Sequence, residues 1–502
     1  MVIDKGGQIV NLQKGVKMSD GWHKEELETA DLGDQRLNER FEDILEAFAA
    51  QPQASIPAAL GGQAELEAAY RFCDNEKVTP QKILQPHRHA TTKRCQQQKV
   101  VLCVQDTTEL DLTRPQQQVV GAGPLDGANR RGALLHLNEA FTEDGTPLGI
   151  VDAEIWAREV SDPDTPKLTP TEKRKKRRVL PIEEKESGRW INGIRATQKL
   201  AGDCPGTLCV SLSDSEGDIY ELFVQPRTTD NFHWIVRAGQ ERIVLDEQGV
   251  SLGVLRDPLL EQPVLFRNEI TVRGREPLIP SDKRPRRMAR ISRKATVEIR
   301  AVAVTIKAPV AGKHAVRSVT VNAVLVREAN PPEGEVPIEW ILLTTLPIST
   351  VEEVAMIIRY YTVRWMIEIY FRTLKSGCRI EERRFETLDR MLACTAIRLI
   401  VAWRTLYVCR LGRSCPDMPC DLIFESSEWQ SVWSVTHRGE PLPPKPPPLP
   451  QMVRLIARLG GYVDRPNRAD PPGVETVWKG LQRMRDLAWG WETFGPGAPP
   501  PS

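Results

Sequence analysis

The chain has 502 residues, too many for one ordinary hydrophobic core, so we expect roughly two to four domains. Hydrophobic residues make up 40% of it and charged residues 27%, a balance that excludes a disordered or fibrous protein. The net charge of +1 gives no overall attraction to nucleic acid, so any binding of phosphate must rely on local clusters of Lys and Arg.

The chain start and the cysteines indicate where the protein works. The first residues, MVIDKGGQIVNLQKG, lack the apolar run of a signal peptide, and no stretch approaches the roughly 20 apolar residues that span a bilayer. The ten cysteines are scattered, without the C-x2-C spacing that structural zinc sites use. We therefore expect a cytoplasmic protein with reduced, mostly buried thiols.

Residues 22–94 have the periodicity of helices. In ADLGDQRLNERFEDILEAFAAQP, Leu, Ile and Phe recur at spacings near three and four, and GGQAELEAAYRFCDNEKVT predicts a second helix. Arg36 and Arg40 are four apart, so they share the polar face of the first helix. That face is either an ordinary solvated surface or a contact surface for a partner.

From residue 99 the pattern changes to that of strands. KVVLCVQ predicts a strand buried on both faces, with Asp106 at its end, and TLCVSLSD predicts another that ends on Asp214. Between them, ALLHLNEAF and PLGIVDAEIWA flank an Asp-Gly turn, which indicates a β-hairpin. Six consecutive basic residues, 173–178, fall in a polar stretch that we expect to be a mobile, solvated loop.

The second half of the chain alternates between strand and helix patterns. Residues 236–345 are β-like and carry a second basic run, KRPRRMARISRK, so we expect an inserted β domain. Helical periodicity returns from about residue 351 to about 411. PLPPKPPPLP then indicates a stiff linker, and the helical unit that follows has apolar residues at helical spacing. These apolar residues either pack internally or meet a partner.

Two predicted strands end on a carboxylate. An unpaired acid at the end of a buried strand is costly, and Mg²⁺ prefers carboxylate oxygens as ligands. Asp106 and Asp214 are therefore candidate metal ligands, although either could instead cap a turn.

A polar stripe occurs within the late helical region. Drawn on one continuous helix, Tyr361, Arg364, Glu368 and Lys375 fall within a sector of about 60°. Because Arg364 and Glu368 are four apart, a salt-bridged surface stripe would have the same pattern. Apolar residues fill the other directions, so this polar face should line something wet or charged.

The string Y-x2-R-x3-E-x6-K formed by these four residues resembles the signature of bacterial insertion-sequence transposases of the DDE class. The segments VQDTTEL, SDSEGDIYELF, HLNEAFTEDGTPLGIVDAEIWARE, KESGRW and IARLGGYVD also resemble family segments and span nearly the whole chain. The resemblance implies an α/β fold with a ribonuclease-H-like catalytic core. The implied domains are a helical DNA-binding domain (1–95), the core in two parts (96–235 and 346–411), the inserted β domain (236–345), a linker (412–450) and a helical C-terminal dimerisation unit (451–502).

The family's activity is cut-and-paste transposition. The resemblance therefore implies an endonuclease that binds the inverted-repeat ends of a transposon in double-stranded DNA, cuts them through a hairpin intermediate and joins them to target DNA. It implies a homodimer in the paired-end complex and an association with the nucleoid. Asp106, Asp214 and Glu368 would be the catalytic, metal-binding carboxylates, holding two Mg²⁺ ions for which Mn²⁺ could substitute.

The resemblance also assigns DNA contacts. Tyr361, Arg364 and Lys375 match positions that hold phosphates near the cleaved end, which suits a guanidinium fork and an ammonium charge. Trp340, in IEWILLTT, matches an aromatic that stacks on a flipped base, although a buried strand tryptophan is the alternative. For the N-terminal domain we expect Arg36 and Arg40 to contact DNA.

The sequence departs from the family after the second aspartate, where Ser215-Glu216-Gly217 replaces Arg-Glu-Ala, so an arginine contact with DNA there is in doubt. The first twenty or so residues have no assigned role. Two other functions remain open, a non-catalytic DNA-binding derivative and a stand-alone nuclease. The three intact acids argue against the first, since acids repel DNA phosphates. The additional terminal units argue against the second.

Overall fold

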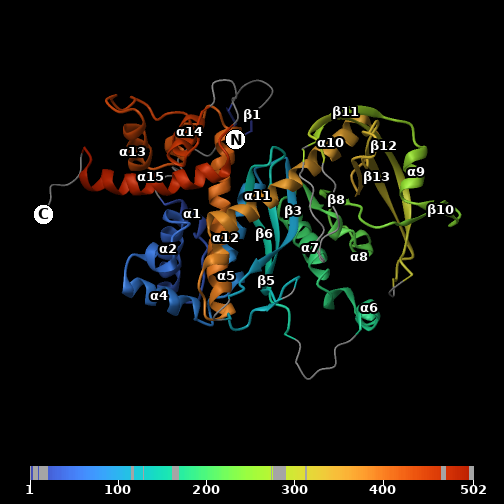
Figure 1. Ribbon diagram of the computed structural model, residues 1–502, viewed down its shortest axis with the longest axis horizontal. Coiled ribbons are helices and arrows are strands. Elements are labelled where there is room, and N and C mark those ends of the chain that lie inside the picture. The colour runs from blue at the N-terminus through green and yellow to red at the C-terminus, as the bar shows by residue number, and fades with distance from the viewer. Residues whose placement is uncertain are drawn as a thin grey trace.

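The computed structural model describes residues 21–114, 118–127, 129–160, 169–272, 274, 290–310, 314–464 and 471–496. It also describes the backbone of the two short paired strands β1 (Val2–Ile3) and β2 (Ile9–Val10). Most of the first twenty residues and most of the basic run KRPRRMARISRK lie outside the described residues. Figure 1 shows a central sheet with helices gathered at one end and long strands at the other.

The N-terminal helices form as expected and pack onto the core. Their bounds are α1 (Trp22–Glu26), α2 (Gln35–Ala50), α3 (Ile56–Leu60), α4 (Gln63–Cys73) and α5 (Pro80–Cys95). Helix α2 begins at Asp34, whose side chain accepts the backbone N–H of Arg36. Its apolar face, with Phe41 and Phe48, is buried in the same hydrophobic core that lies beneath the sheet.

One twelve-stranded sheet runs through the molecule, in the order β10-β9-β12-β13-β14-β8-β7-β3-β5-β4, with β11 on β12 and β6 on β5. The strands are β3 (Val100–Asp111), β4 (Gly123–Pro124), β5 (Arg131–Phe141), β6 (Pro147–Trp156), β7 (Leu208–Ser213), β8 (Phe232–Arg237), β9 (Ile243–Leu245), β10 (Ser251–Val254), β11 (Phe266–Val272), β12 (Arg293–Lys307), β13 (Ser318–Glu328) and β14 (Glu339–Thr344). Strands β3, β7 and β8 are parallel, and the predicted hairpin is β5–β6.

The strands of the inserted segment belong to this same sheet. Strand β14 pairs with β8 through Leu342 and Arg237, and β13, β12 and β9 follow outward. The β segment expected as an insertion at 236–345 thus extends the core sheet. The physical reason is that the open edge of β8 exposes backbone groups that need partners, and β14 supplies them.

The first basic run forms a helix instead of a loop. Helix α6 (Pro170–Val179) begins at Thr169, whose side chain and backbone exchange hydrogen bonds with Glu172 in a capping box. The sequence signal was present as Thr-Pro-Thr-Glu, because this pattern caps a helix whose first residue is proline. The helices that follow are α7 (Gly188–Asp203), α8 (Tyr220–Phe223) and α9 (Arg256–Glu261).

The late helical region is interrupted. Helix α10 (Val351–Thr362) passes through a 3₁₀ turn into α11 (Met366–Arg372), and a π-helical segment, Thr373–Gly377, ends it. The assumption of one continuous helix from residue 361 to residue 375 is therefore wrong, because the π turn changes the angle per residue.

Helix α12 (Leu388–Ser414) runs through the centre of the helical end. An 18-residue window of this helix is, by length and composition alone, apolar enough to cross a membrane, contrary to the expectation that no stretch comes close. However, 89% of that window is buried inside the protein, as in the core helix of a folded domain. The ten cysteines are free and mostly buried, as expected.

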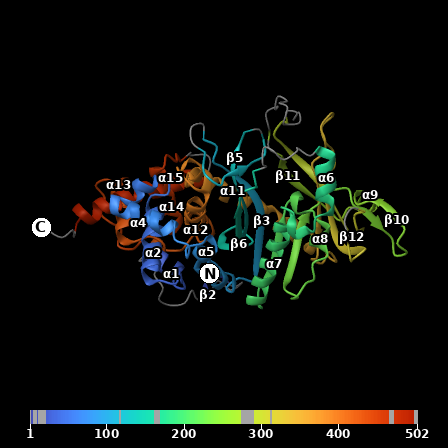
Figure 2. The same cartoon turned by 90° about the horizontal axis from the view of Figure 1, so that it is seen from below.

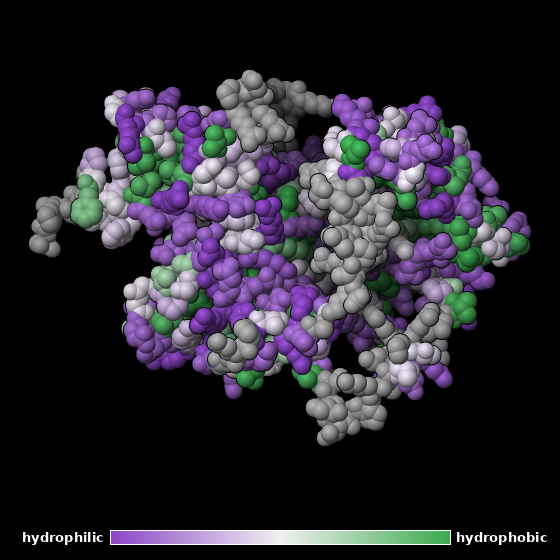
Figure 3. Space-filling model, viewed as in Figure 1, coloured by the Kyte–Doolittle hydropathy of each residue, from purple (hydrophilic) through white to green (hydrophobic). Residues whose placement is uncertain are grey.

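Three helices form the C-terminal unit: α13 (Ser426–Thr436), α14 (Leu449–Leu459) and α15 (Val474–Phe494). Helix α13 lies within the predicted linker 412–450 and packs on α15 through a shared core, so that expectation is corrected as well. Apolar Met452, Ile456 and Met484 pack inside the unit. In the space-filling view apolar residues also gather on the surface over these helices (Figure 3).

Candidate active site

Two parallel strands bring Asp106 and Asp214 to the same level of the sheet. Strand β3 pairs with β7 up to Val104 and Leu212, and each aspartate lies two residues further along. Asp214 directly follows the end of β7, as predicted. Asp106 does not end its strand, because β3 continues to Asp111 on the pairing with β5. Seen from below, β3 lies between the helical end of the molecule and the strands β11 and β12 (Figure 2).

The two aspartates act on each other electrostatically. Burial, followed by the charge of Asp214, raises the pKa of Asp106 to about 7, while the Thr107 N–H and Arg364 oppose this rise. Because two close carboxylates repel each other in a partly buried place, a cation between them would be stabilising. Carboxylate oxygens are the ligand type that Mg²⁺ prefers, so the donor chemistry fits this metal.

The turn after Asp214 adds a third acid that the sequence reading did not single out. The Asp214 side chain accepts the N–H of Glu216 at 2.8 Å, so this aspartate also caps a turn. Burial and the charge of Asp214 raise the pKa of Glu216. A side chain on Gly217 would place its Cβ only 2.5 Å from the Cβ of Ser213, so this turn has no room for alanine.

Arg364 lies between two of the predicted carboxylates. Its guanidinium donates to Glu368 Oε1 at 2.6 Å and to Asp106 Oδ2 at 3.4 Å, and its side chain is 13% exposed. Within the described ranges, no three His, Cys, Asp or Glu side chains converge closely enough to hold a metal ion. The guanidinium of Arg364 therefore separates Glu368 from Asp106, and these acids do not form a closed set of metal ligands.

Tyr361 lies at the same place, buried beside the charges of Arg364, Arg237 and Asp214. Burial raises the pKa of Tyr361 to about 12, so the side chain is a neutral phenol at pH 7. Arg237 ends β8 and is exposed. The sequence reading missed it, although FHWIVR ends on a charge just as TLCVSLSD does.

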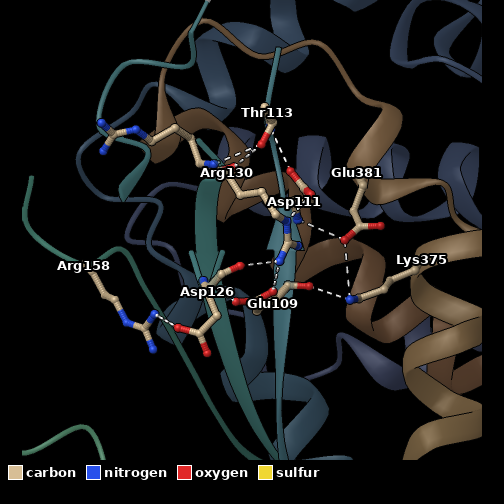
Figure 4. Close-up of polar contacts among 9 residues, drawn as sticks. Glu109, Asp111, Thr113, Asp126, Arg130, Arg158, Lys375 and Glu381 are labelled. Atoms are coloured by element: carbon tan, nitrogen blue, oxygen red, sulfur yellow. Dashed lines mark hydrogen bonds and ion pairs between the residues drawn. The ribbon is translucent and has the colours of Figure 1, made fainter. Parts of the chain in front are cut away.

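Lys375 contacts a polar network along the far half of β3. Its ammonium donates to the carbonyl of Glu109 at 2.5 Å and lies 3.5 Å from Glu381. The Glu109 carboxylate in turn accepts from Arg130 at 2.6 Å (Figure 4). Lys375 thus faces the same strand as Arg364, even though the π turn separates it from the helix that carries Glu368.

The other predicted residues are placed differently. Trp340 is a half-buried residue of β14, two positions past the pairing of Leu342 with Arg237, so it extends beyond the end of β8. Arg36 and Arg40 lie on α2, in the N-terminal helical unit and not on the sheet that carries the aspartates. The side chain of Arg36 is 90% exposed and lies 3.7 Å from Asp34, and Arg40 pairs with Asp43 at 3.4 Å.

A polar ladder beneath Asp106 holds the central strands in register. Thr107 Oγ1 lies 2.8 Å from His136 Nδ1, and His136 Nε2 lies 3.2 Å from Gln105 Oε1. Gln105 donates to Ser211 on β7 at 2.9 Å. Burial lowers the pKa of His136 to about 3, so its ring stays neutral and ties β5 to β3 without adding charge to the site.

Three family models match the chain in this order: transposase DNA-binding at residues 19–78, transposase DDE domain at 166–403 and transposase Tn5 dimerisation domain at 400–491. Together with a mixed α/β sheet consistent with a ribonuclease-H-like core, they define the class of protein. The chain is a DDE-type DNA transposase, an endonuclease that acts on DNA. More particularly, it has the domain order of a Tn5-like transposase.

Among solved structures, the chain is similar to a piggyBac transposase synaptic complex with hairpin DNA, at 10% identity and a TM-score of 0.34, covering 87% of this chain and 80% of that one. This likeness is too weak to carry an argument about the site. The DDE-domain match includes Asp214 and Glu368 but begins after Asp106, whose place in the site rests on the sheet register.

Proposed function

We propose that this transposase works by cut-and-paste, binding inverted repeats at the ends of its own transposon, cutting them and transferring the strands to target DNA. The observation that carries the proposal is the β3–β7 register, which sets Asp106 beside Asp214 while Arg364 links Asp106 to Glu368. Three carboxylates with this relation suit metal-dependent phosphodiester chemistry.

Asp106, Asp214 and Glu368 would hold Mg²⁺ or Mn²⁺, with two ions per site. When bound, such ions activate water or a DNA 3′-hydroxyl and stabilise the leaving oxygen. The chain itself supplies the oxygen donors. For these donors to bind metal, Arg364 must leave its place between Asp106 and Glu368. A DNA phosphate can draw Arg364 away, because a guanidinium binds phosphate in two-point fashion.

The residues around the acids suit the backbone of a transposon end. We assign phosphate contacts to Tyr361, Arg364 and Lys375, and stacking on a flipped base to Trp340, with a hairpin intermediate on the cleaved end. In the DNA-free protein Arg364 is neutralised by Asp106 and Glu368, and Lys375 is near Glu381. DNA phosphates would compete with these internal acids for the side chains of Arg364 and Lys375.

The terminal units would supply end recognition and pairing at the nucleoid. We propose that the N-terminal helices read the inverted repeat, with Arg36 and Arg40 in contact with DNA. Two ends must be cut and joined to one target, so we propose a homodimer in the paired-end complex, built on the C-terminal unit that matches a dimerisation domain.

The test compares Asp106→Asn, Asp214→Asn and Glu368→Gln on a duplex ending in the inverted repeat that flanks the gene. Each variant should bind this end in a band-shift titration as wild type does, and cleavage with Mg²⁺ should fall below detection. Glu247→Gln, an exposed acid at a distant turn of the same sheet, should cut normally.

Substantial Mg²⁺-dependent cleavage by any one of the three variants would mean that the metal ligands are wrongly assigned. A wild-type protein that binds the end and never cuts it would instead be the binding-only derivative, and one that cuts without preferring the end would be a plain nuclease.

A further inference from the structure

Helix α6 has a composition that the fold does not explain. Its sequence is PTEKRKKRRV, with six consecutive basic residues, in a chain whose net charge is only +1. Six consecutive positions span more than one helical turn, so like charges recur at spacings of three and four, where they repel. A helix of this length is marginal by itself, and most helices in proteins are stabilised by packing an apolar face.

The side chains of α6 that the structure describes show no such packing. All five side chains of α6 that the structure describes are exposed: Thr171, Glu172, Lys175, Lys176 and Val179. Val179, the helix's own apolar residue, is 81% exposed. Figures 1 and 2 both place α6 at the periphery of the molecule. The helix therefore has a capping box at its start, but none of its five described side chains is covered by the rest of the described chain.

In contrast, the chain just before and just after α6, here called the base of α6, is held together by side-chain contacts. Arg158, just before it, donates to both oxygens of Glu186, just after it, at 2.6 and 2.9 Å. Arg189 stacks over the ring of Trp156 with its guanidinium carbon 3.4 Å from the ring centroid. Two pairs thus join the outgoing strand to the returning chain, and α6 is held out from a rigid base.

That base is connected to the candidate active site. Arg158 also donates to Asp126 at 2.7 Å, and the backbone of Asp126 donates to Glu109 at 2.8 Å. The carbonyl of Glu109 accepts the ammonium of Lys375, the residue assigned to a DNA phosphate (Figure 4). A continuous set of contacts therefore fixes the base of α6 relative to β3, which carries Asp106.

We propose that α6 is a DNA-backbone clamp, which binds the phosphates of duplex DNA leading to or from the active site. This inference rests on the proposed function, because that function brings duplex DNA to β3. Clustered Lys and Arg on a helix without an apolar face suit phosphates, since such binding needs charge and no particular base sequence. The duplex is either DNA flanking the transposon end or target DNA, and the two share this chemistry.

The experiment measures how DNA affinity depends on salt, with the full-length protein and no divalent metal, so that no cutting occurs. One arm uses a duplex with the flanking inverted repeat and its adjoining DNA. The other offers a duplex of unrelated sequence to protein already bound to a repeat. The proteins are wild type, Lys175→Gln with Lys176→Gln, and a charge-matched control, Lys307→Gln with Lys445→Gln, at exposed lysines elsewhere.

Each lost phosphate contact lowers the slope of log affinity against log salt by about 0.9, so the α6 variant should lose about 1.8. The loss should appear in the first arm if α6 binds flanking DNA and in the second if it binds target DNA. The control, and Lys175→Arg with Lys176→Arg, should keep the wild-type slope in both arms.

A wild-type slope for the α6 variant in both arms would overturn the clamp, as would an equal loss in the control. These outcomes differ from a failure of the proposed function, in which wild-type protein itself would show no preference for the repeat over unrelated DNA.

Discussion

Arg364 occupies the space between the two acids that the proposed reaction must free. Its pKa is raised, because the hydrogen bond to Glu368 and the charges of Asp106 and Glu368 outweigh the effect of burial. The guanidinium is therefore charged at any ordinary pH, and it competes with a divalent cation for the same oxygens. Metal binding and DNA binding are expected to be coupled through this one side chain.

Replacing this arginine gives the first prediction. Arg364→Gln should bind Mn²⁺ more tightly than wild type in the absence of DNA, because the competing guanidinium is gone, and should cut the transposon end more slowly, because a phosphate contact is lost. Mn²⁺ titration followed by electron paramagnetic resonance measures the first effect. Equal or weaker Mn²⁺ binding by the variant would show that Arg364 does not block the site.

A buried ion-pair network fixes the N-terminal helices to the core. Glu26 on α1 accepts two hydrogen bonds from Arg94, at 2.8 and 3.0 Å, and one from His87 at 2.5 Å. The other nitrogen of His87 accepts the N–H of Ile150 on β6. Burial works against the charge of Glu26, but Arg94 and His87 together lower the pKa of Glu26 from 4.5 to about 2.

Glu26→Gln should therefore destabilise the protein, by about 3–5 kcal/mol for breaking a buried ion pair. The wild-type stabilisation should also depend on pH. A carboxyl whose pKa is lowered on folding stabilises the protein above its ordinary pKa of 4.5, and this contribution is lost as pH falls toward 2. Burial lowers the pKa of His87 as well, which adds to the loss in acid.

Thermal unfolding at neutral pH and below pH 4.5 measures both effects. Glu28→Gln, which removes an exposed partner of Lys93, is the matched control and should change little. If Glu26→Gln unfolds like wild type at neutral pH, the network does not stabilise the docked helices.

At the scale of elements, the spacing of apolar residues predicted most strands and helices. Apolar residues alternate in a half-buried strand and recur every three or four positions in an amphipathic helix. It placed Asp106 at a strand end, whereas β3 continues to Asp111 on its pairing with β5. That error arose because the run of fully buried residues stops at Gln105, near the end of the pairing with β7, and the mostly half-buried remainder of β3 lacks an apolar run.

Features set by distant contacts were not predictable. The π turn that carries Lys375, the guanidinium between Asp106 and Glu368, and the joining of β14 to β8 all depend on tertiary packing. The capping box of α6 was readable in the sequence, but the run of six charges drew attention to solvation instead of to the helix start.

Helix α2 carries the prediction about end recognition. Arg36 is 90% exposed and lies 3.7 Å from Asp34, whereas Arg40 is 35% exposed and lies 3.4 Å from Asp43, so a DNA contact by Arg40 must replace the closer ion pair of a less exposed side chain. We expect Arg36→Ala to lose more affinity for the inverted repeat than Arg40→Ala, within the roughly 1–3 kcal/mol of a base contact. Band shifts at fixed salt measure this loss, with Lys307→Gln as the control. Unchanged affinity in both variants would mean that the polar face of α2 is an ordinary solvated surface.

In the whole molecule, α12 connects the three matched domains. It packs against α2, α4 and α5 on one part of its length and against α14 and α15 on another. Buried Val408, Cys409 and Leu411 of α12 belong to the same cluster as Met452 and Ile456. Removing residues 451–502 would therefore expose core residues, and a deletion cannot separate pairing from folding.

Surface substitutions test pairing more cleanly. Trp489 is 69% exposed and Phe494 is 82% exposed on α15. We expect Trp489→Ser with Phe494→Ser to keep the fold and single-end binding but to weaken the paired-end complex, because the dimer would bury these side chains. Light scattering of end-bound protein measures the effect, with Val250→Ser, at another exposed apolar residue, as the control. An undiminished paired complex would exclude α15 as the interface.

The central claim is that Asp214 and its partners hold the metal ions that cut DNA. Asp214→Cys tests it most directly, because a thiolate is a poor ligand for Mg²⁺ and a better one for Mn²⁺. We predict that this variant binds the transposon end, does not cut it with Mg²⁺, and recovers cleavage when Mn²⁺ replaces Mg²⁺. Cleavage at the wild-type rate with Mg²⁺ would contradict the claim.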